Sequence, residues 1–338
     1  MEDVYLGEFQ HGNGNPNRND HMGPPAKTVL AVGQTGIYRG WNRESGSPSI
    51  QISLFRIGGL SIERHIVQAR VAVARDAIWL MAIDDEEPFK EMFWDGVTGL
   101  PMGTNTRDAE VRTLAVSANG KFTAAGLADG SIVLTALSEP ISEQKLFAQT
   151  AISALALSPD GQWVVAGDES GVVNLWDTAS GKHRVERHHA KIVQAVVDPS
   201  GSRVAIADEI GVITVSELAS GAELFSYASP APVEAIALSA QGRLAIAATK
   251  FEVFDVASHR LLAHKETDVP TREMLFTPNG EAVFYVVNNQ ILVWPWNPAV
   301  NLSEVCARIR PFLKDDDWAQ LQAVHPLLGK GACVQQEN

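Results

Sequence analysis

The sequence predicts an all-β fold made of repeated groups of strands, and two periodic patterns predict it. The first is a turn tetrapeptide ending in glycine, which returns every 38 to 41 residues at 117–120, 158–161, 198–201, 239–242 and 277–280. Each copy stands between two alternating apolar runs, and its proline, aspartate, asparagine and glycine residues favour tight turns. A fixed period near forty residues with several strands per period indicates a radial or stacked repeat.

The second pattern has the same period and lies about eighteen residues after each turn. It is an apolar strand that ends in an aromatic or acidic residue, often before a further turn, and its clearest copies are 175–181 and 93–99. The residues at the aromatic position of successive copies are Phe55, Trp94, Thr135, Trp176, Ser216, Phe254 and Trp294. The turn pattern extends back to 74–77 and 33–36, so the two patterns together predict seven units of four strands.

These residues resemble the WD40-repeat family of β-propellers. Leu175, Trp176 and Asp177 match the dipeptide that names the family, and residues 152–161 are similar to its first strand and turn. The resemblance covers roughly residues 28–297 and implies four-stranded blades of about forty residues around a central channel. It therefore implies a seven-bladed WD40-type β-propeller over residues 28–300.

The family often holds each blade with a buried network of histidine, serine or threonine, aspartate and tryptophan, and no blade here carries the full set. His188 has the histidine position, but its blade carries Ser216 in place of tryptophan. Asp129 has the aspartate position in the turn between the second and third strands, but its blade carries Thr135 in place of tryptophan. The corresponding turn of the next blade offers Ser170. We therefore expect the packing of Val, Ile, Leu and Ala to hold the blades.

The N-terminal segment, residues 1–27, lies outside the repeat. Residues 10–27 are rich in glycine, asparagine and proline and are predicted to be flexible, whereas residues 3–9 have the composition of a strand. A propeller whose ring is not closed presents unpaired strand edges. The resemblance implies closure by a strand from the other end of the chain, so residues 3–9 are the candidate outer strand of the seventh blade. The alternative is a disordered start that leaves this blade with three strands.

The C-terminal segment, residues 301–338, is predicted to be a short α-helical tail. Leu302, Val305 and Ile309 recur at helical spacing. Asn301 or Ser303 can cap the start of the helix, and Pro311 should end it. The tail is similar to the segment that follows the repeats in many large bacterial WD40 proteins, which often carry a signalling domain upstream. This resemblance implies a bacterial propeller.

Charge and composition limit the classes of partner. The 338 residues carry a formal net charge of −13, so nucleic acid and anionic membrane surfaces are not the expected partners. No apolar stretch approaches the ~20 residues of a membrane span, and the acidic start has no export signal. Cys306 and Cys333 are the two cysteines, either free thiols or a disulfide that holds the tail. Free thiols agree with a cytoplasmic protein, because that compartment keeps thiols reduced.

The sequence offers little catalytic chemistry. It contains no phosphate-binding loop, no nucleophile elbow and no zinc-binding histidine pair of the common types. The polar runs 182–189 and 84–87 could hold a metal ion, but a solvated strand and a solvated loop explain them. The positions expected to face the channel, five residues before each turn, are Thr28, Ala69, Arg112, Ser153, Val193, Glu234 and Arg272. One carboxylate and no histidine do not make a metal site, so we expect no catalytic, cofactor or metal site.

The predicted function is a non-catalytic scaffold or sensor module that binds a protein or peptide, as a monomer or within a larger assembly. Arg112, Glu234 and Arg272 are the candidate partner-binding residues, because they are the charged members of the predicted ring. The alternative for these three is that they pair with one another or are solvated. Two other functions remain open: a propeller enzyme or small-ligand binder that uses the channel, and the sensor subunit of a bacterial signalling system with a separate effector.

Overall fold

The computed structural model describes the strands between residues 4 and 84, residues 87–95, and residues 101–297 except 138–140, 189, 268–269, 272, 278 and 288–289. Side chains are described from residue 81 onward. The predicted flexible segment 10–27, the predicted helical tail 301–338, Cys306 and Cys333 lie outside the described residues. Within them, no helix has the length and apolar character needed to cross a membrane.

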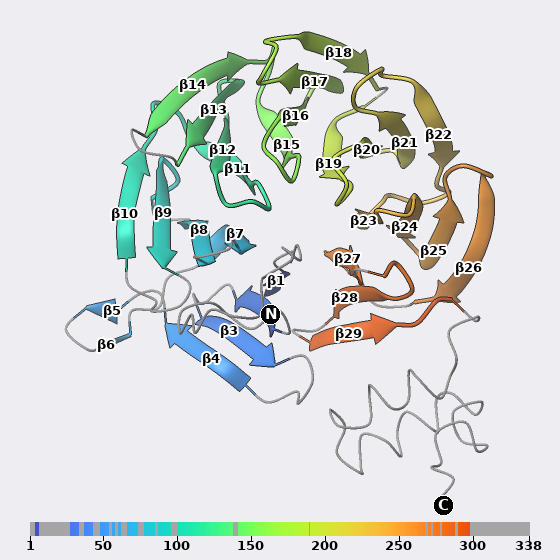
Figure 1. The fold of residues 1–338 in the computed structure, drawn as a ribbon, viewed down its shortest axis with the longest axis horizontal. Helices are drawn as coiled ribbons and strands as arrows, with labels where there is room; N and C mark the ends of the chain where they lie inside the picture. The colour runs from blue at the N-terminus through green and yellow to red at the C-terminus, as the bar shows by residue number, and fades with distance from the viewer. Residues whose placement is uncertain are drawn as a thin grey trace, which may run out of the picture.

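The described strands form six antiparallel sheets of four strands, one sheet of three strands and one short hairpin. Figure 1 shows the sheets standing side by side around a central space, each with one strand nearest the centre and one at the rim. This arrangement is an all-β propeller. The first sheet contains β1 (Val4–Leu6), β2 (Thr28–Gly33), β3 (Ile37–Asn42) and β4 (Pro48–Ser53). The second contains β7 (Ile66–Val73), β8 (Ile78–Asp84), β9 (Lys90–Asp95) and β10 (Pro101–Thr106). The third contains β11 (Val111–Val116), β12 (Phe122–Leu127), β13 (Ser131–Ala136) and β14 (Ser142–Phe147).

The later sheets repeat the same order from the centre to the rim. They are β15 (Ile152–Leu157), β16 (Trp163–Asp168), β17 (Val172–Asp177) and β18 (His183–Arg187); β19 (Ile192–Val197), β20 (Arg203–Asp208), β21 (Val212–Glu217) and β22 (Glu223–Ala228); β23 (Ala235–Leu238), β24 (Arg243–Ala247), β25 (Lys250–Asp255) and β26 (Arg260–Glu266); and β27 (Met274–Phe276), β28 (Val283–Val287) and β29 (Gln290–Trp294). The hairpin consists of β5 (Arg56–Ile57) and β6 (Leu60–Ser61).

The turn tetrapeptides connect the inner strand to the second strand in the last five sheets. Their glycines have φ between 65° and 76°, a left-handed conformation that a side chain would strain. In one copy, Ser158 Oγ donates to Asp160 Oδ1 at 2.5 Å and accepts a hydrogen bond from Trp163 N at 2.8 Å. The predicted period thus corresponds to a real repeated turn.

Adjacent sheets pack face to face through apolar side chains. Between the third and fourth sheets, Ile132, Leu134, Leu155 and Trp176 belong to one buried cluster. Space for this packing is made by small residues near the ends of the second strands. A Cβ atom on Gly167 would lie 2.4 Å from Ile192 Cγ2 of the next sheet.

The same pairing of a small residue with a branched one recurs at neighbouring interfaces between sheets. A Cβ atom on Gly126 would lie 2.5 Å from Ile152 Cγ2, so this interface is equally close. The corresponding residue of the fifth sheet is Ala207, which shares a buried cluster with Val233, a residue smaller than the isoleucine of the other two interfaces. Residue size is therefore matched between neighbouring sheets: glycine contacts isoleucine at two interfaces, and alanine shares a cluster with valine at the next.

The predicted position of the N-terminal strand is wrong. Residues 4–6 form β1, which pairs with β2 through Val4 and Gly33 and is the inner strand of the first sheet. It is not the outer strand of the last sheet, which has three strands within the described part of the chain. Within the described residues, each of these two sheets is therefore built from one end of the chain alone.

The first copy of the aromatic pattern was also misplaced. Trp41 is the fifth residue of β3, as Trp94 is of β9 and Trp176 is of β17, so Trp41 takes the place assigned to Phe55. Phe55 itself lies outside the described residues. The hairpin β5–β6 lengthens the first repeat. A constant period counted back from Trp94 therefore reaches Phe55, which follows β4, instead of Trp41 in β3. Thr28 accordingly begins a second strand and not an inner one.

Aspartates hold the turns that follow the second strands. In the third sheet Asp129 does so at the predicted position, since its Oδ1 accepts a hydrogen bond from Ser131 N at 2.9 Å, whereas in the next two sheets the aspartate stands two positions earlier. The buried Asp168 accepts hydrogen bonds from the N–H groups of Ser170 and Val172, both at 2.9 Å. In the fifth sheet the buried Asp208 lies 3.9 Å from His188 Nδ1, and His188 Nε2 lies 3.2 Å from Thr214 Oγ1. Part of the polar network is therefore present without its tryptophan.

Candidate functional site

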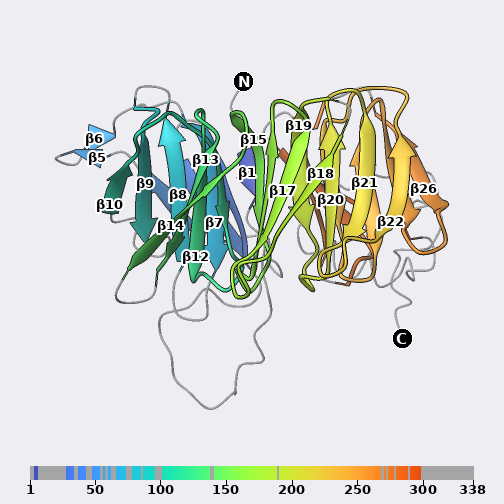
Figure 2. The same ribbon diagram turned by 90° about the horizontal axis from the view of Figure 1, so that it is seen from above.

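The propeller has two faces, defined by the ends of its strands. Because neighbouring strands run in opposite directions, the turns between second and third strands lie at the same end as the starts of the inner strands. We call this end face A, and it comprises residues 87–89, 108–112, 128–130, 148–151, 169–171, 190–192, 209–211, 229–234 and 248–249. Face B carries the turns between third and outer strands, residues 178–181, 218–221 and 257–259. Figure 2, seen along the sheets, shows turns gathered at these two opposite ends.

Arg112 lies on face A as the second residue of β11. Its side chain is 47% exposed, and its Nη2 atom lies 3.2 Å from Glu110 Oε2. A pair this exposed contributes at most about 1 kcal/mol to folding, so Arg112 can exchange Glu110 for another carboxylate at little cost. Arg112 is thus held by an acid of its own sheet and faces solvent.

Two lysines are also paired with acids: Lys191 on face A and Lys145 on the outer strand β14. Lys145 Nζ lies 2.8 Å from Asp108 Oδ2, and Lys191 Nζ lies 2.9 Å from Glu169 Oε1. The hydrogen bond from Lys145 is the main cause that holds the pKa of Asp108 below its usual range. The hydrogen bond from Lys191 does the same for the pKa of Glu169. These carboxylates therefore stay charged at neutral pH, and face A is a mixed surface with charges of both signs.

Glu234 links two sheets. Its Oε2 atom accepts a hydrogen bond of 2.8 Å from the N–H of Thr271, which is fully buried in the next sheet. Gln194 Nε2 donates to the carbonyl oxygen of Glu234 at 2.8 Å, and Gln194 Oε1 accepts from Ile236 N at 2.7 Å. Glu234 therefore holds the sixth sheet to the seventh, and Gln194, which the sequence analysis missed, holds the fifth to the sixth.

A second predicted ring residue has the same role. Ser153 Oγ donates a hydrogen bond of 2.6 Å to the carbonyl oxygen of Ile192, at the start of the next inner strand. The predicted ring is thus in part a set of polar links between neighbouring sheets. Such links satisfy backbone groups at the interface and fix the angle between the sheets.

The structure does not bring Arg112 and Glu234 together. Arg112 is on β11 and Glu234 precedes β23, and Figure 1 places these strands across the central space from each other. Arg272 lies outside the described residues. Arg112 and Glu234 are not paired with each other, as the alternative expected: Arg112 pairs with Glu110, and Glu234 accepts a hydrogen bond from Thr271 N.

Face A also exposes large apolar side chains. Phe89, in the turn between β8 and β9, is 47% exposed, and Ile210, in the turn between β20 and β21, is 58% exposed. The exposed Glu209 adjoins Ile210. Apolar side chains surrounded by charged ones are the usual composition of a surface that binds another protein.

The two described histidines of the run 182–189 are engaged in different places. His183 stacks on Trp176 with ring centroids 4.9 Å apart, and its Nε2 lies 3.0 Å from Asn174 Oδ1. His188 contacts Thr214, and His189 lies outside the described residues. Across the described part of the chain, no three His, Cys, Asp or Glu side chains gather as a metal site would require.

Comparisons with known proteins agree with this architecture. Residues 142–177, which run from β14 through β17, match the family model "WD domain, G-beta repeat". One similar solved structure is a chain in the crystal structure of the mitotic checkpoint complex, with 15% identity over 80% of this chain and 84% of that chain and a TM-score of 0.64. Another is the β-propeller domain of Cps50 (Swd1) from Myceliophteria thermophila, with 14% identity over 81% and 94% and a TM-score of 0.65.

No curated protein matches the sequence. At these identities the structural likeness establishes the fold alone. The chain therefore has an all-β propeller fold and contains one segment, residues 142–177, that matches the WD40 repeat model.

Proposed function

We propose that this chain is a non-catalytic module that binds a protein or peptide partner through face A. The observation that carries the proposal is the exposure of Phe89 and Ile210 among paired charges, on turns held by a rigid set of sheets. Binding residues concentrate on such turns because the scaffold fixes them in place. One of the similar structures is itself part of a protein complex, which supports this class of function by analogy of fold.

The proposal includes features that the sequence alone suggests. The seven sheets are the blades of a seven-bladed propeller, which residues 28–300 form with β1, and residues 301–338 are a helical tail of the kind that follows bacterial WD40 repeats. The protein acts in the cytoplasm, without a cofactor, as a monomer or within a larger assembly. A sensor subunit whose effector is a separate polypeptide is one form of this function.

Arg112, Glu234 and Arg272 are the proposed partner-binding residues, and Arg112 is the exposed member within the described residues. The test begins with affinity capture from the native source and measurement of the dissociation constant of the purified complex. Arg112→Ala combined with Arg272→Ala should weaken binding at least tenfold, on the order of 1.4 kcal/mol, because interface arginines form paired hydrogen bonds.

The control for this pair is Arg260→Ala, which removes an exposed cation near face B. The control variant should bind like the natural protein, and all variants should unfold at the same temperature. Equal affinity of the double variant and the natural protein would overturn the assignment of these arginines. Failure to isolate any stoichiometric complex would count against the binding function itself.

A further inference from the structure

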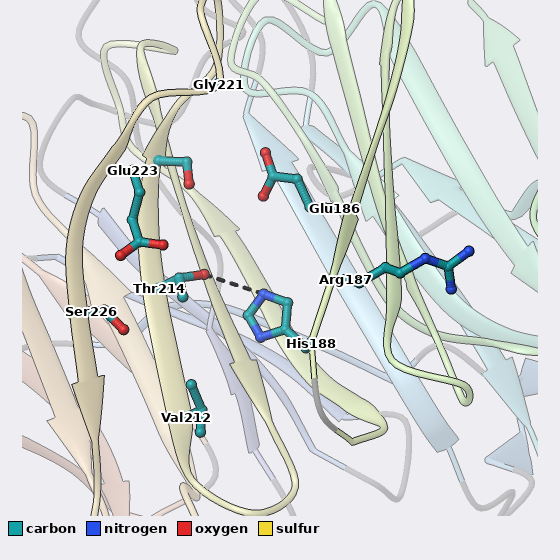
Figure 3. Close-up of a pocket in the computed structure, with 9 residues that line it drawn as sticks. Glu186, Arg187, His188, Val212, Thr214, Gly221, Glu223 and Ser226 are labelled. Carbon is teal, nitrogen blue, oxygen red and sulfur yellow. Dashed lines mark hydrogen bonds between the residues drawn. The ribbon is translucent and has the colours of Figure 1, made fainter.

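A cavity of about 400 Å³ opens at the rim between the fourth and fifth sheets. Its walls come from the outer strand β18 on one side and from β21 and β22 on the other. The residues that matter for its chemistry are Glu186, His188, Thr214, Ser216, Glu223 and Ser226. In Figure 3, Glu186 and Glu223 approach the cavity from opposite sides, with the His188–Thr214 contact beside it.

The cavity exists because two apolar positions of the repeat are polar here. At each interface, a residue on the outer strand of one sheet faces the fifth residue of the third strand in the next sheet. Corresponding pairs, placed by their strand registers, are Leu146 with Trp176, Tyr227 with Phe254, and Glu186 with Ser216. The first pair shares one apolar cluster, and the rings of the second lie 4.8 Å apart. At the third, the side chains needed to fill the space are absent.

Another interface in the same chain shows what such a polar site can hold. Between the second and third sheets, the fifth residue of β13 is Thr135, and Glu143 lies directly across from it on β14. The guanidinium of Arg107 occupies this interface, with Nη1 2.7 Å from Glu143 Oε1 and Nε 2.5 Å from Glu91 Oε1. A hydroxyl residue with a glutamate across from it thus accompanies a buried guanidinium.

The cavity repeats this arrangement, but no guanidinium lies between its hydroxyl and its glutamate. The guanidinium of Arg184, at the same interface, is held by Glu186 and by the carbonyl oxygen of Leu218 and is not part of the cavity lining. Ser216 is the fifth residue of β21, and Glu223 lies directly across from it on β22. Ser216 is only 5% exposed, and its hydroxyl makes no hydrogen bond with the described residues. Glu223 is exposed at the mouth and forms no ion pair with them.

The charges around the cavity leave one carboxylate without compensation. Arg184 Nε lies 3.1 Å from Glu186 Oε1, so Glu186 is already paired. The guanidinium of Arg187 points away from the cavity in Figure 3. Glu223 is therefore the carboxylate that remains free to pair with one additional cation, and the hydroxyl of Ser216 offers an acceptor below it.

We propose that this cavity binds the guanidinium of an arginine side chain presented by the partner polypeptide. This inference rests on the proposed binding function and adds a specificity site at the rim. A guanidinium suits the site because its planar set of donors can pair with a carboxylate and a hydroxyl together. The volume lies within the range of pockets that hold small groups.

The first test needs no partner. The probes are the acetyl-methylamide derivatives of arginine and of citrulline, which has nearly the same shape without the charge. Titration followed by the NMR amide signals of β21 and β22 should give saturable shifts with arginine at millimolar concentrations and none with citrulline. Glu223→Gln should weaken arginine binding at least fivefold. Ser216→Trp, which restores the aromatic residue of the other interfaces, should abolish it.

The matched control is Glu217→Gln, which removes one negative charge from the residue next to Ser216 on the opposite side of β21. It should bind arginine as the natural protein does. If Ser216→Trp does not fold, Glu223→Gln decides the question. Equal shifts with citrulline, or unchanged arginine binding by Glu223→Gln, would overturn the proposal.

The second test identifies the source of the guanidinium. In the captured complex, Glu223→Gln should raise the dissociation constant at least fivefold, and Glu217→Gln should leave it unchanged. If the arginine probe binds but the complex is insensitive to Glu223→Gln, the part of the proposal that assigns the arginine to a partner is wrong. The binding function at face A would stand in that case.

Discussion

Replacing Arg107 with methionine should lower the free energy of unfolding by about 3–5 kcal/mol. The side chain of Arg107 is 7% exposed and that of Glu91 is 1% exposed. Arg107 donates to both carboxylate oxygens of Glu91, at 2.5 and 2.9 Å, and to Glu143 at 2.7 Å. Without the arginine, Glu91 is left as a buried charge with no guanidinium beside it. Urea-induced unfolding followed by circular dichroism measures the loss.

The control for this variant removes both charges. Burial alone would lower the pKa of Arg107, but the hydrogen bonds and charges of Glu91 and Glu143 outweigh it and raise that pKa. The arginine therefore stays charged, and the cost of the single variant arises at Glu91. Arg107→Met combined with Glu91→Met should recover most of the lost stability, because no buried charge remains. A loss below about 1 kcal/mol for Arg107→Met would show that Glu91 is solvated in the native protein.

Gly167→Val should destabilise the fold by about 3 kcal/mol. Even a Cβ atom at this position would lie 2.4 Å from Cγ2 and 2.5 Å from Cβ of Ile192, so the fourth and fifth sheets would have to separate. The backbone of Gly167 is not left-handed, so crowding alone causes the cost. The change in unfolding free energy, measured as for Arg107, gives its size.

Gly181→Ala is the matched control for crowding. A Cβ atom at Gly181 would meet no heavy atom within 4 Å, but the residue has a φ of 69°. Its cost of roughly 1 kcal/mol should come from backbone strain alone. If Gly167→Val costs no more than this control, the sheets are not packed as closely at Ile192 as the structure indicates.

The sequence predicted the repeat correctly wherever turn and strand residues recur at a constant distance. From Trp94 to Trp294, every residue assigned to the aromatic position is the fifth of a third strand. The strands of the first sheet were predicted incorrectly, because the hairpin β5–β6 interrupts the period and a long segment separates β1 from β2. An aromatic residue, Trp41, did mark the correct strand.

The site was harder to predict because it depends on pairs of residues from different repeats. A polar residue near the start of an inner strand can face either the channel or the next sheet. The choice depends on backbone groups of the next sheet, such as Thr271 N, which donates a hydrogen bond to Glu234. The substitutions Thr135 and Ser216 were visible as departures from the repeat. Only the structure shows that Arg107 occupies the space beside one of them and that a cavity adjoins the other.

The central claim is that face A binds a protein partner, and amide hydrogen exchange on the purified complex tests it most directly. Exchange reports local opening and burial residue by residue along the chain. The account predicts slower exchange on binding in the face A segments 108–112, 128–130, 169–171 and 209–211. The face B turns 178–181, 218–221 and 257–259 should exchange at unchanged rates. Protection confined to the face B turns, or a stoichiometric complex with no protection on face A, would contradict the claim.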